Sequence, residues 1–396
     1  MRLIADAAAR LDSFTDAAYA LSLARLSISA QHVHTLAQEI GNDLARCRDE
    51  KAAQGRRRLP PRVPQTPELV VVEVDGGRLR TREADAGPGV HGVQNKENKV
   101  AGLLTLVGEV HTQDPQPEPP LSFVQPRRVE RLVRQMAGQA GEARPAVAAA
   151  GESEAAVAEP APALDPDREP WAPRKGLRTC IATMADSQVF GRLVAAEAQE
   201  RDFYWARRRA FVGDGAAYNW TLQRTHFSDF VPVADFLHVL CYVYAAAWAA
   251  GKDEAGRWEQ YLAWLRACWQ GRVREVVEEM KQWQEQIGRP PPGEELPASD
   301  PRRALAEAVS YLTNNAERMD YPRYRQEGLP ITSSLVESLV GEFNTRVKSR
   351  QKFWNRGEGA EAILQLRAAI LSEDGRLDRY FAERPGSAYR RRASNN

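Results

Sequence analysis

The chain has 396 residues, of which 43% are hydrophobic and 27% charged, and its formal net charge is +1 at pH 7. Such a chain is typical of a globular protein with one large domain or a few smaller ones, and any basic surface must be local. Its four cysteines are widely spaced without a CxxC pair, which argues against a zinc ribbon or a disulfide framework and fits a reducing compartment. No run of about 18 apolar residues predicts a transmembrane helix, and the start lacks a signal-peptide core. We therefore expect a cytoplasmic protein with no membrane partner.

The N-terminal residues 1–58 have a helical, polar-rich pattern. A break at Ser27–Ser29 separates two segments, and the second, His32–Arg48, repeats apolar residues at spacing four until Gly41 interrupts it. Two helices joined in this way resemble a helix-turn-helix that reads DNA, but an ordinary helical hairpin has the same pattern. The basic run Arg56–Arg58 before two prolines indicates a linker.

The next stretch, Leu69–Arg80, is the strongest strand signal in the chain. Its valines make both alternating faces apolar, which predicts a central strand covered on both sides. Asp75 comes where this run ends, and Gly76-Gly77 predicts a tight turn into a second strand, Arg78–Arg82. With a third strand at Val100–Val110, residues 68–110 are expected to form a meander.

A carboxylate on a buried strand is costly unless it is paired or binds a metal. Asp75 is therefore a candidate metal ligand. The competing interpretation is an ordinary turn residue before two glycines.

The middle of the chain alternates between strand and helix signals. A short helix is predicted at Arg127–Met136, and residues 138–170 are too poor in large apolar side chains to fold, which predicts a disordered insertion. Order resumes at Ser187. The elements expected after it are a helix at Val189–Arg208, a strand at Ala210–Val212, a helix at Ala217–Thr225 and a strand at Phe230–Ala234.

The last part is predicted to be helical. Residues 236–287 are rich in tryptophan, and aromatic residues at this spacing indicate a core rather than a ligand cage. A proline-rich loop follows at Arg289–Pro297, and Asp300-Pro301 is a typical helix start. Two more helices are expected at Thr332–Lys348 and Glu358–Ser372.

This order of elements predicts an α/β protein with a ribonuclease-H-like mixed sheet flanked by helices, a helical insertion after the last strand and an N-terminal helical region. In such a sheet the first and fourth strands are neighbours, so Asp75 and Asp214 would meet at one end. Glu337, on a late helix, would lie across that pair. Three carboxylates favour a hard divalent cation, most naturally Mg²⁺, and two such ions can cleave a phosphodiester.

Each of the two later acids also has a structural explanation. Asp214 lies between two glycines, as many turn residues do. Glu337 stands three residues after Ser334, which is the spacing of a capping box.

Four blocks of sequence resemble a known family: VEVDGG at 72–77, GDG at 213–215, DFLH at 235–238, and TSSLVESLVGEFNTRVKSRQKFWN at 332–355. From about residue 68 to 392 the chain resembles DDE transposases of bacterial insertion sequences, closest to the Kra-type branch. The last block is the most specific and GDG the least.

The resemblance implies that Asp75, Asp214 and Glu337 bind two Mg²⁺ ions, with Mn²⁺ as a possible substitute, for DNA strand cleavage and strand transfer. It implies that Asp235 and His238, in an acid-x-x-His motif, support the site or position DNA. The expected partners are DNA, as element ends and target, and further copies in a homodimer or larger assembly. The expected location is the cytoplasm, in association with the nucleoid.

The helix after Glu337 is expected to contact DNA. Positions 337, 341, 344 and 348 share one face, and Asn344 stands where many DDE enzymes have a basic residue, so Lys348 is the expected phosphate contact. Trp354 is a candidate to stack on an unpaired base, and the alternative is that it packs in the core. For the charged residues of this region the alternative is a solvated face that contacts nothing. The predicted DNA-binding residues are Arg346, Lys348, Arg350, Lys352 and Trp354.

The predicted domains are a helical N-terminal region (1–58), two parts of the catalytic domain (66–137 and 171–238) separated by the disordered insertion (138–170), a helical insertion (239–320) and C-terminal helices with the catalytic Glu (321–392). Two other functions remain open from the sequence. One is a truncated or domesticated relative that only binds DNA, and the other is a ribonuclease-H-like nuclease with a different substrate.

Overall fold

The structure is a computed structural model. It describes residues 1–54, 66–81, 94–140, 171–250, 253–294, 296–297, 299–333, 339, 341–343, 346–347, 354 and 357–384. The disordered insertion predicted at 138–170 lies outside the described residues beyond Ala140, where α5 ends.

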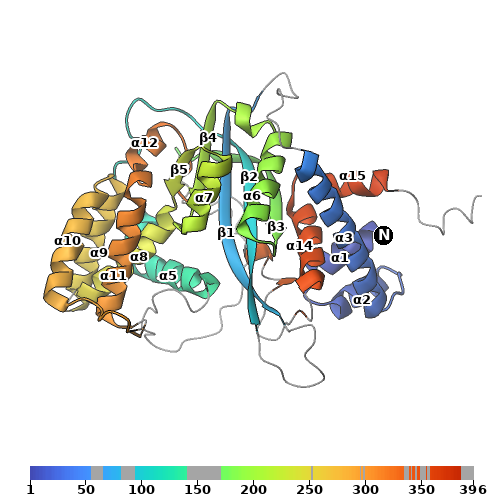
Figure 1. The fold of residues 1–396 in the computed structure, drawn as a ribbon, viewed down its shortest axis with the longest axis horizontal. Helices are drawn as coiled ribbons and strands as arrows, with labels where there is room; N and C mark the ends of the chain where they lie inside the picture. The colour runs from blue at the N-terminus through green and yellow to red at the C-terminus, as the bar shows by residue number, and fades with distance from the viewer. Residues whose placement is uncertain are drawn as a thin grey trace, which may run out of the picture.

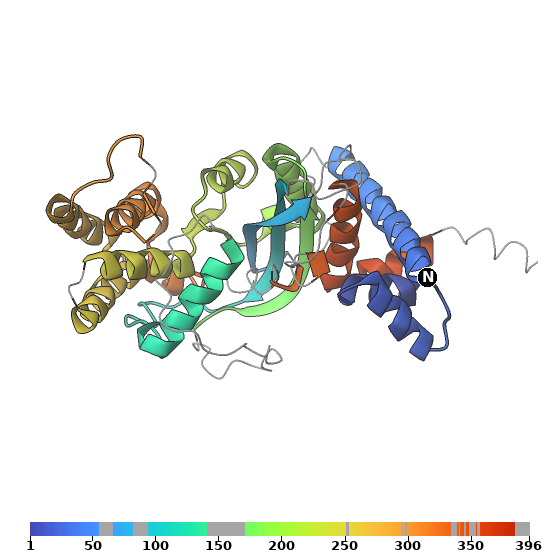
Figure 2. The same ribbon diagram turned by 90° about the horizontal axis from the view of Figure 1, so that it is seen from below.

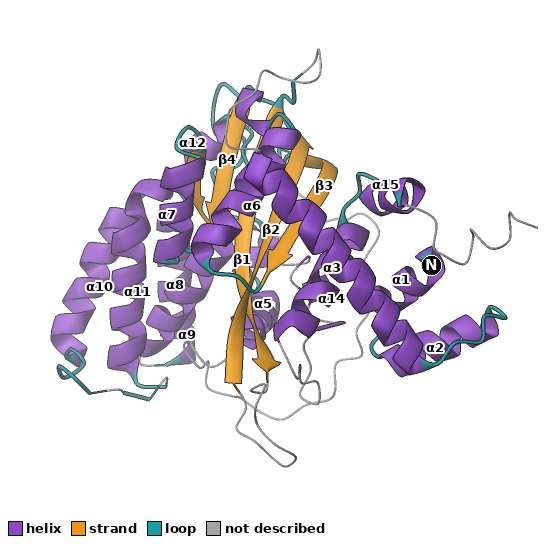
Figure 3. Cartoon of the chain, turned by 45° about the vertical axis from the view of Figure 1, so that its right-hand side comes forward, coloured by secondary structure: helices purple, strands orange, loops and turns teal. Residues whose placement is uncertain are grey.

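The described strands form one mixed sheet, which Figure 3 shows in orange with helices on both sides. The strands are β1 (Leu69–Thr81), β2 (Gln94–Val107), β3 (Arg174–Thr183), β4 (Arg208–Gly213) and β5 (Val231–Ala234). Their order in the sheet is β3-β2-β1-β4-β5. β2 is antiparallel to both β1 and β3, whereas β4 is parallel to both β1 and β5. The predicted α/β class, with a mixed sheet flanked by helices, is therefore confirmed.

The turn predicted at Gly76-Gly77 is wrong. β1 continues through both glycines to Thr81 and pairs with β2 along its whole length, from Leu69 opposite Leu106 to Thr81 opposite Gln94. The glycines keep an extended backbone, since neither is among the glycines with positive φ. Pairing with a long partner strand therefore overrides the local tendency of Gly-Gly to turn.

β3, which lies at the sheet edge, has no counterpart among the predicted strands. Its first four residues are exposed and only the end, including Cys180 and Ala182, is buried. The apolar signal is therefore too short to predict a strand. β4 and β5 lie where strands were predicted.

The helices are α1 (Arg2–Arg10), α2 (Phe14–Leu23), α3 (Ala30–Gln54), α4 (Leu121–Val124), α5 (Pro126–Ala140), α6 (Ser187–Glu200), α7 (Ala217–His226), α8 (Phe236–Ala250), α9 (Glu254–Trp269), α10 (Val273–Ile287), α11 (Pro301–Asn315), α12 (Tyr321–Gln326), α14 (Gly357–Leu371) and α15 (Arg376–Glu383). Short 3₁₀ turns lie at Phe203–Trp205 and Ala316–Arg318. In the part of the chain that the structure describes, no helix is both long enough and apolar enough to cross a bilayer.

The two faces of the sheet carry different layers. In Figure 1 the N-terminal helices and α14 lie on one side of the sheet and the bundle α8–α11 on the other. Figure 2 shows the same separation from below, with the teal α5 on the bundle side of the sheet. Trp264 and Trp269 are each 1% exposed within the bundle, which confirms their predicted core role.

The N-terminal helices belong to the core that covers one face of the sheet. Buried residues of α1, α2 and α3 share a hydrophobic cluster with α14 and with Leu79 and Val100 of the sheet. Gly41 does not interrupt α3, contrary to the prediction. A Cβ at Gly41 would overlap the backbone of Ala362, so this glycine lets α3 and α14 cross closely.

Candidate active site

Strand register places Asp75 and Asp214 next to each other. Val74 and Gly213 are the last residues paired between β1 and the parallel β4. Asp75 follows Val74 within β1, and Asp214 comes directly after the end of β4 at Gly213. The expectation that the first and fourth strands are neighbours is thus confirmed, and it brings the two aspartates to one place in the sheet.

Asp75 is half-buried, and its Oδ1 accepts a hydrogen bond from the Gly76 amide at 2.7 Å. Asp75 pairs with Val100, and alternate residues of a strand share a face. Asp75 therefore lies on the same face as Leu79 and Val100, both of which are buried under the N-terminal helices and α14.

Asp214 is held by the loop between β4 and α7. Its Oδ1 accepts hydrogen bonds from the Ala216 amide at 2.9 Å and from Asn219 Nδ2 at 2.8 Å. Asn219 is fully buried, so the orientation of the carboxylate is fixed from within the fold. Gly215 has φ +95°, and a Cβ there would overlap the ring of Tyr311. The loop therefore needs glycine both for its backbone angle and for packing against α11.

Tyr218 lies beside both aspartates. Burial raises its pKa well above the ordinary value, and the negative charges of Asp214, Asp75 and Glu97 raise it further. Its hydroxyl would be 3.4 Å from a Cβ at Gly76, the residue that follows Asp75. Tyr218 is thus a neutral hydrogen-bonding group next to the two acids.

Asp235, which follows β5, forms a buried network with His238 and Ser333. Asp235 is 0% and His238 3% exposed, and His238 Nδ1 lies 2.7 Å from Asp235 Oδ2. The Ser333 hydroxyl donates to Oδ2 at 2.7 Å, and the amides of Ser333 and Leu237 each donate to Oδ1 at 3.1 Å. Burial acts to raise the pKa of Asp235, but the hydrogen bonds from His238 and Ser333 outweigh it and hold the pKa below the ordinary value.

This network ties the end of β5 to Ser333, four residues before Glu337. Asp235 and His238 are too buried to touch DNA in this structure. Of the two roles expected for them, the geometry favours support of the site.

The third predicted acid, Glu337, lies outside the described residues, as do Lys348, Arg350 and Lys352. Among the described residues no group of three or more His, Cys, Asp or Glu side chains is placed to hold a metal. Leu339, Phe343 and Val347 are helical and share the buried cluster with Leu79 and Val100. The described part of the helix after Glu337 thus packs on the face of the sheet that carries Asp75.

Two of the predicted DNA-binding residues, Arg346 and Trp354, make contacts within the protein. Arg346 is 3% exposed, and its guanidinium donates to the backbone oxygens of Ala8 at 2.8 Å and Asp12 at 3.4 Å, at the end of α1. The burial and these internal hydrogen bonds are unfavourable to a DNA contact of Arg346, which stays a prediction. Trp354 is half-buried, packs against the same core and donates its indole N–H to Val347 O at 2.9 Å. This arrangement favours the core alternative for Trp354.

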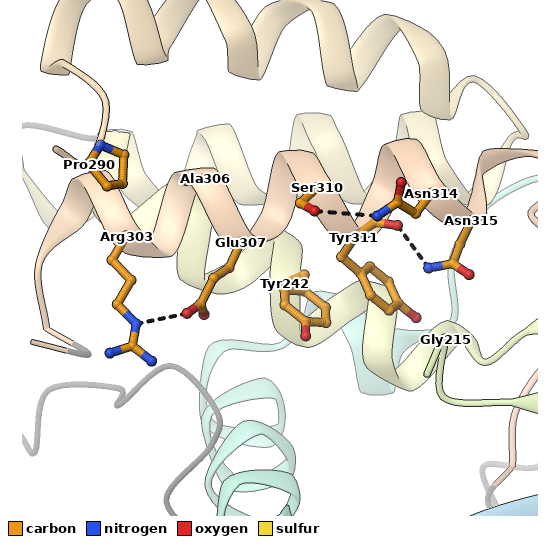
Figure 4. A pocket seen from close by; sticks show the side chains of 10 residues that line it. All are labelled: Gly215, Tyr242, Pro290, Arg303, Ala306, Glu307, Ser310, Tyr311, Asn314 and Asn315. Atoms are coloured by element: carbon orange, nitrogen blue, oxygen red, sulfur yellow. Dashed lines mark hydrogen bonds and ion pairs between the residues drawn. The ribbon is translucent and has the colours of Figure 1, made fainter. Parts of the chain in front are cut away.

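Two surface pockets adjoin the Asp214 loop. One, of about 450 Å³, runs along α11 from Gly215 to Pro290 and is walled by Tyr242 and Tyr311, whose rings stack with centroids 4.1 Å apart (Figure 4). The other, of about 510 Å³, is lined by Tyr218 together with residues of β2 and of the start of α6. The helical bundle therefore contributes to the surroundings of Asp214.

Sequence reasoning did not single out three residues of this site: Tyr218, Asn219 and Ser333. Tyr218 and Asn219 come one helical turn after Asp214, a spacing that returns a side chain to the start of its helix. Ser333 lies in the block 332–355 that carries the resemblance, but no local pattern indicated its contact with Asp235.

Comparisons with known proteins give no family. A scan against protein-family models finds no match, and a search of curated proteins finds no similar sequence.

Proposed function

We propose that this protein is a DDE transposase that cleaves and joins the DNA of its own insertion sequence in a metal-dependent reaction. The observation that carries the proposal is the register of β1 and β4, which sets Asp75 beside Asp214. Two acids at this position are what the resemblance of the sequence to DDE transposases requires, and Glu337 is the proposed third.

A ribonuclease-H-like fold is part of the proposal. It is supported by the sheet order β3-β2-β1-β4-β5, with three antiparallel strands leading into two parallel ones. The helical bundle begins directly after β5, where the resemblance places an insertion.

The residues present suit a divalent metal. Carboxylate oxygens are the ligands that Mg²⁺ prefers, with Mn²⁺ as the substitute, and Asp75 and Asp214 offer them side by side. Two bound ions would supply activation of the attacking oxygen and stabilisation of the leaving oxygen. The chain's own contribution is orientation: Asn219 holds Asp214, and the Asp235 network holds Ser333, four residues before Glu337 in the sequence.

The proposed reaction has two steps on DNA. Water first attacks the phosphorus at the element end and breaks the bond to the 3′ oxygen, which leaves as a 3′-hydroxyl. That hydroxyl then attacks a phosphorus of target DNA in line and displaces another 3′ oxygen. DNA is accordingly the proposed partner, bound by a homodimer or larger assembly in the nucleoid.

Cleavage of labelled DNA with flanking inverted repeats, in the presence of Mg²⁺, tests the proposal. Asp75→Asn should abolish cleavage and retain DNA binding, because it removes a charged ligand and keeps the side-chain shape. Full cleavage by this variant would refute the assignment of Asp75. DNA binding without cleavage by the natural protein would favour the DNA-binding alternative, and cleavage without strand transfer would favour a nuclease.

A further inference from the structure

The side chain of Asn98 is buried without a hydrogen-bond partner. It is 0% exposed, and neither its Oδ1 nor its Nδ2 is bonded to any residue that the structure describes. An unsatisfied buried amide is costly, and such groups in native proteins are explained by an ordered water, a bound ion, local strain or a catalytic role. Asn98 therefore needs an explanation that the packing of the chain does not give.

Asn98 lies on the same face of the sheet as Asp75. It is opposite Gly77, and Asp75 is opposite Val100, so the two side chains are diagonal neighbours across the β1–β2 pair. Diagonal side chains of antiparallel strands are roughly 7–8 Å apart at their bases. An ion placed between Asp75 and Asn98 would therefore be within reach of an oxygen of each side chain.

Gly77 makes room for the carboxamide. A Cβ at Gly77 would be 2.8 Å from Asn98 Oδ1, so a larger residue there would displace the carboxamide from its present position. The backbone of Gly77 is an ordinary strand backbone, so a turn does not explain the glycine. Space for Asn98 does explain it.

We propose that Asn98 supplies a carboxamide oxygen to the divalent cation held by Asp75, with Gly77 as the residue that leaves it space. The inference rests on the proposed function, because it needs a cation at Asp75. Amide oxygens are suitable ligands for Mg²⁺ and Mn²⁺, and a neutral ligand adds coordination without adding repulsion between carboxylates. The Asn98 carboxamide would add a ligand to Asp75 and Asp214, since no third His, Cys, Asp or Glu among the described residues is placed to complete a metal site with them.

The test is thermal unfolding of the full chain with and without Mg²⁺ or Mn²⁺. A cation that binds the folded state raises the unfolding temperature, and at a fixed metal concentration the rise grows with the logarithm of the affinity. Asn98→Leu has a similar size and removes the unsatisfied amide, so without metal its unfolding temperature should equal or exceed that of the natural protein. Its apparent metal affinity should fall by about 10- to 100-fold. Gly77→Ala should weaken metal binding in the same direction, because its methyl group displaces the carboxamide.

Asn315→Leu is the matched control. Asn315 is also a buried amide, but it accepts from Trp220 Nε1 at 2.7 Å and donates to Tyr311 O at 2.9 Å. Its replacement should lower the unfolding temperature without metal and leave the metal-induced rise in place.

Three outcomes decide the matter. Loss of the metal response in Asn98→Leu, with stability kept, supports the inference. An unchanged metal response, or a loss of stability like that of Asn315→Leu, overturns it and leaves the proposed function standing. No metal response in the natural protein, or the same response in Asp75→Asn, overturns both.

Discussion

Replacing Asp235 by Ala should be one of the most destabilising single changes in this protein. The carboxylate is fully buried and accepts hydrogen bonds from Ser333, through both its hydroxyl and its amide, and from the Leu237 amide, with His238 at 2.7 Å. Bonds to a charged acceptor are worth about 1.5–3 kcal/mol each, but bonds that share one acceptor are not additive. Removing one partner of a buried charged network typically costs about 3–5 kcal/mol, which is the loss expected in the free energy of unfolding.

Asp253→Ala is the matched control. Asp253 caps α9 by accepting from the Gly256 amide at 2.8 Å, and it is exposed. Loss of such a cap costs about 1 kcal/mol. Urea unfolding followed by tryptophan fluorescence measures both variants. A loss in Asp235→Ala no larger than that in Asp253→Ala would refute the network as a source of stability.

The same network predicts a pH dependence. The pKa of Asp235 is lower in the folded protein than the value of about 3.9 expected in the unfolded chain. Its contribution is therefore complete above about pH 4 and is lost as the pH falls through the lowered folded pKa. The stability difference between the natural protein and Asp235→Asn should accordingly shrink on acidification below about pH 4. A difference that grows there would contradict the direction of the shift.

Two further changes test the loop and the N-terminal helices. Gly215→Ala should lower the free energy of unfolding, measured in urea, by more than Gly293→Ala does. Both glycines have positive φ, but only at Gly215 would the added Cβ also overlap Tyr311. The backbone strain alone costs about 1–2 kcal/mol, and overpacking adds about 1–3 kcal/mol. Equal losses would remove the contact with α11 from the explanation. Arg346→Met should destabilise the protein by about 2 kcal/mol or more, because the carbonyls of Ala8 and Asp12 lose a charged donor, and it should leave the salt dependence of DNA binding unchanged. If the DNA affinity of Arg346→Met depended less on salt concentration than that of the natural protein, with stability unchanged, the predicted DNA contact of Arg346 would be supported.

The elements that the sequence predicts well are those with strong local signals. β1 up to Val74 and the strands β4 and β5 are apolar on both faces, and Asp300 with Pro301 marks the start of α11. The turn at Gly76-Gly77 was wrong because its local signal is weaker than pairing with β2. β3 was missed because an edge strand buries only part of its length.

The candidate site likewise has some features that the sequence predicts and others that it does not. The adjacency of Asp75 and Asp214 follows from the order of strands, which can be inferred from the sequence. The contact between Asp235 and Ser333 joins residues 98 positions apart, and the position of Asn98 depends on the register of β2. Neither leaves a pattern that a single sequence reveals.

The N-terminal helix α1 is hydrogen-bonded to two arginines from the C-terminal part of the chain. Arg346 donates to Ala8 O, and Arg367 of α14 donates to Ala9 O and Glu342 O. Two guanidinium groups thus bind the carbonyl end of one helix, where the helix dipole favours positive charge. One of these groups belongs to the helix that follows Glu337. These contacts and the shared buried cluster join α1 to the helical residues that pack over the Asp75 face of the sheet.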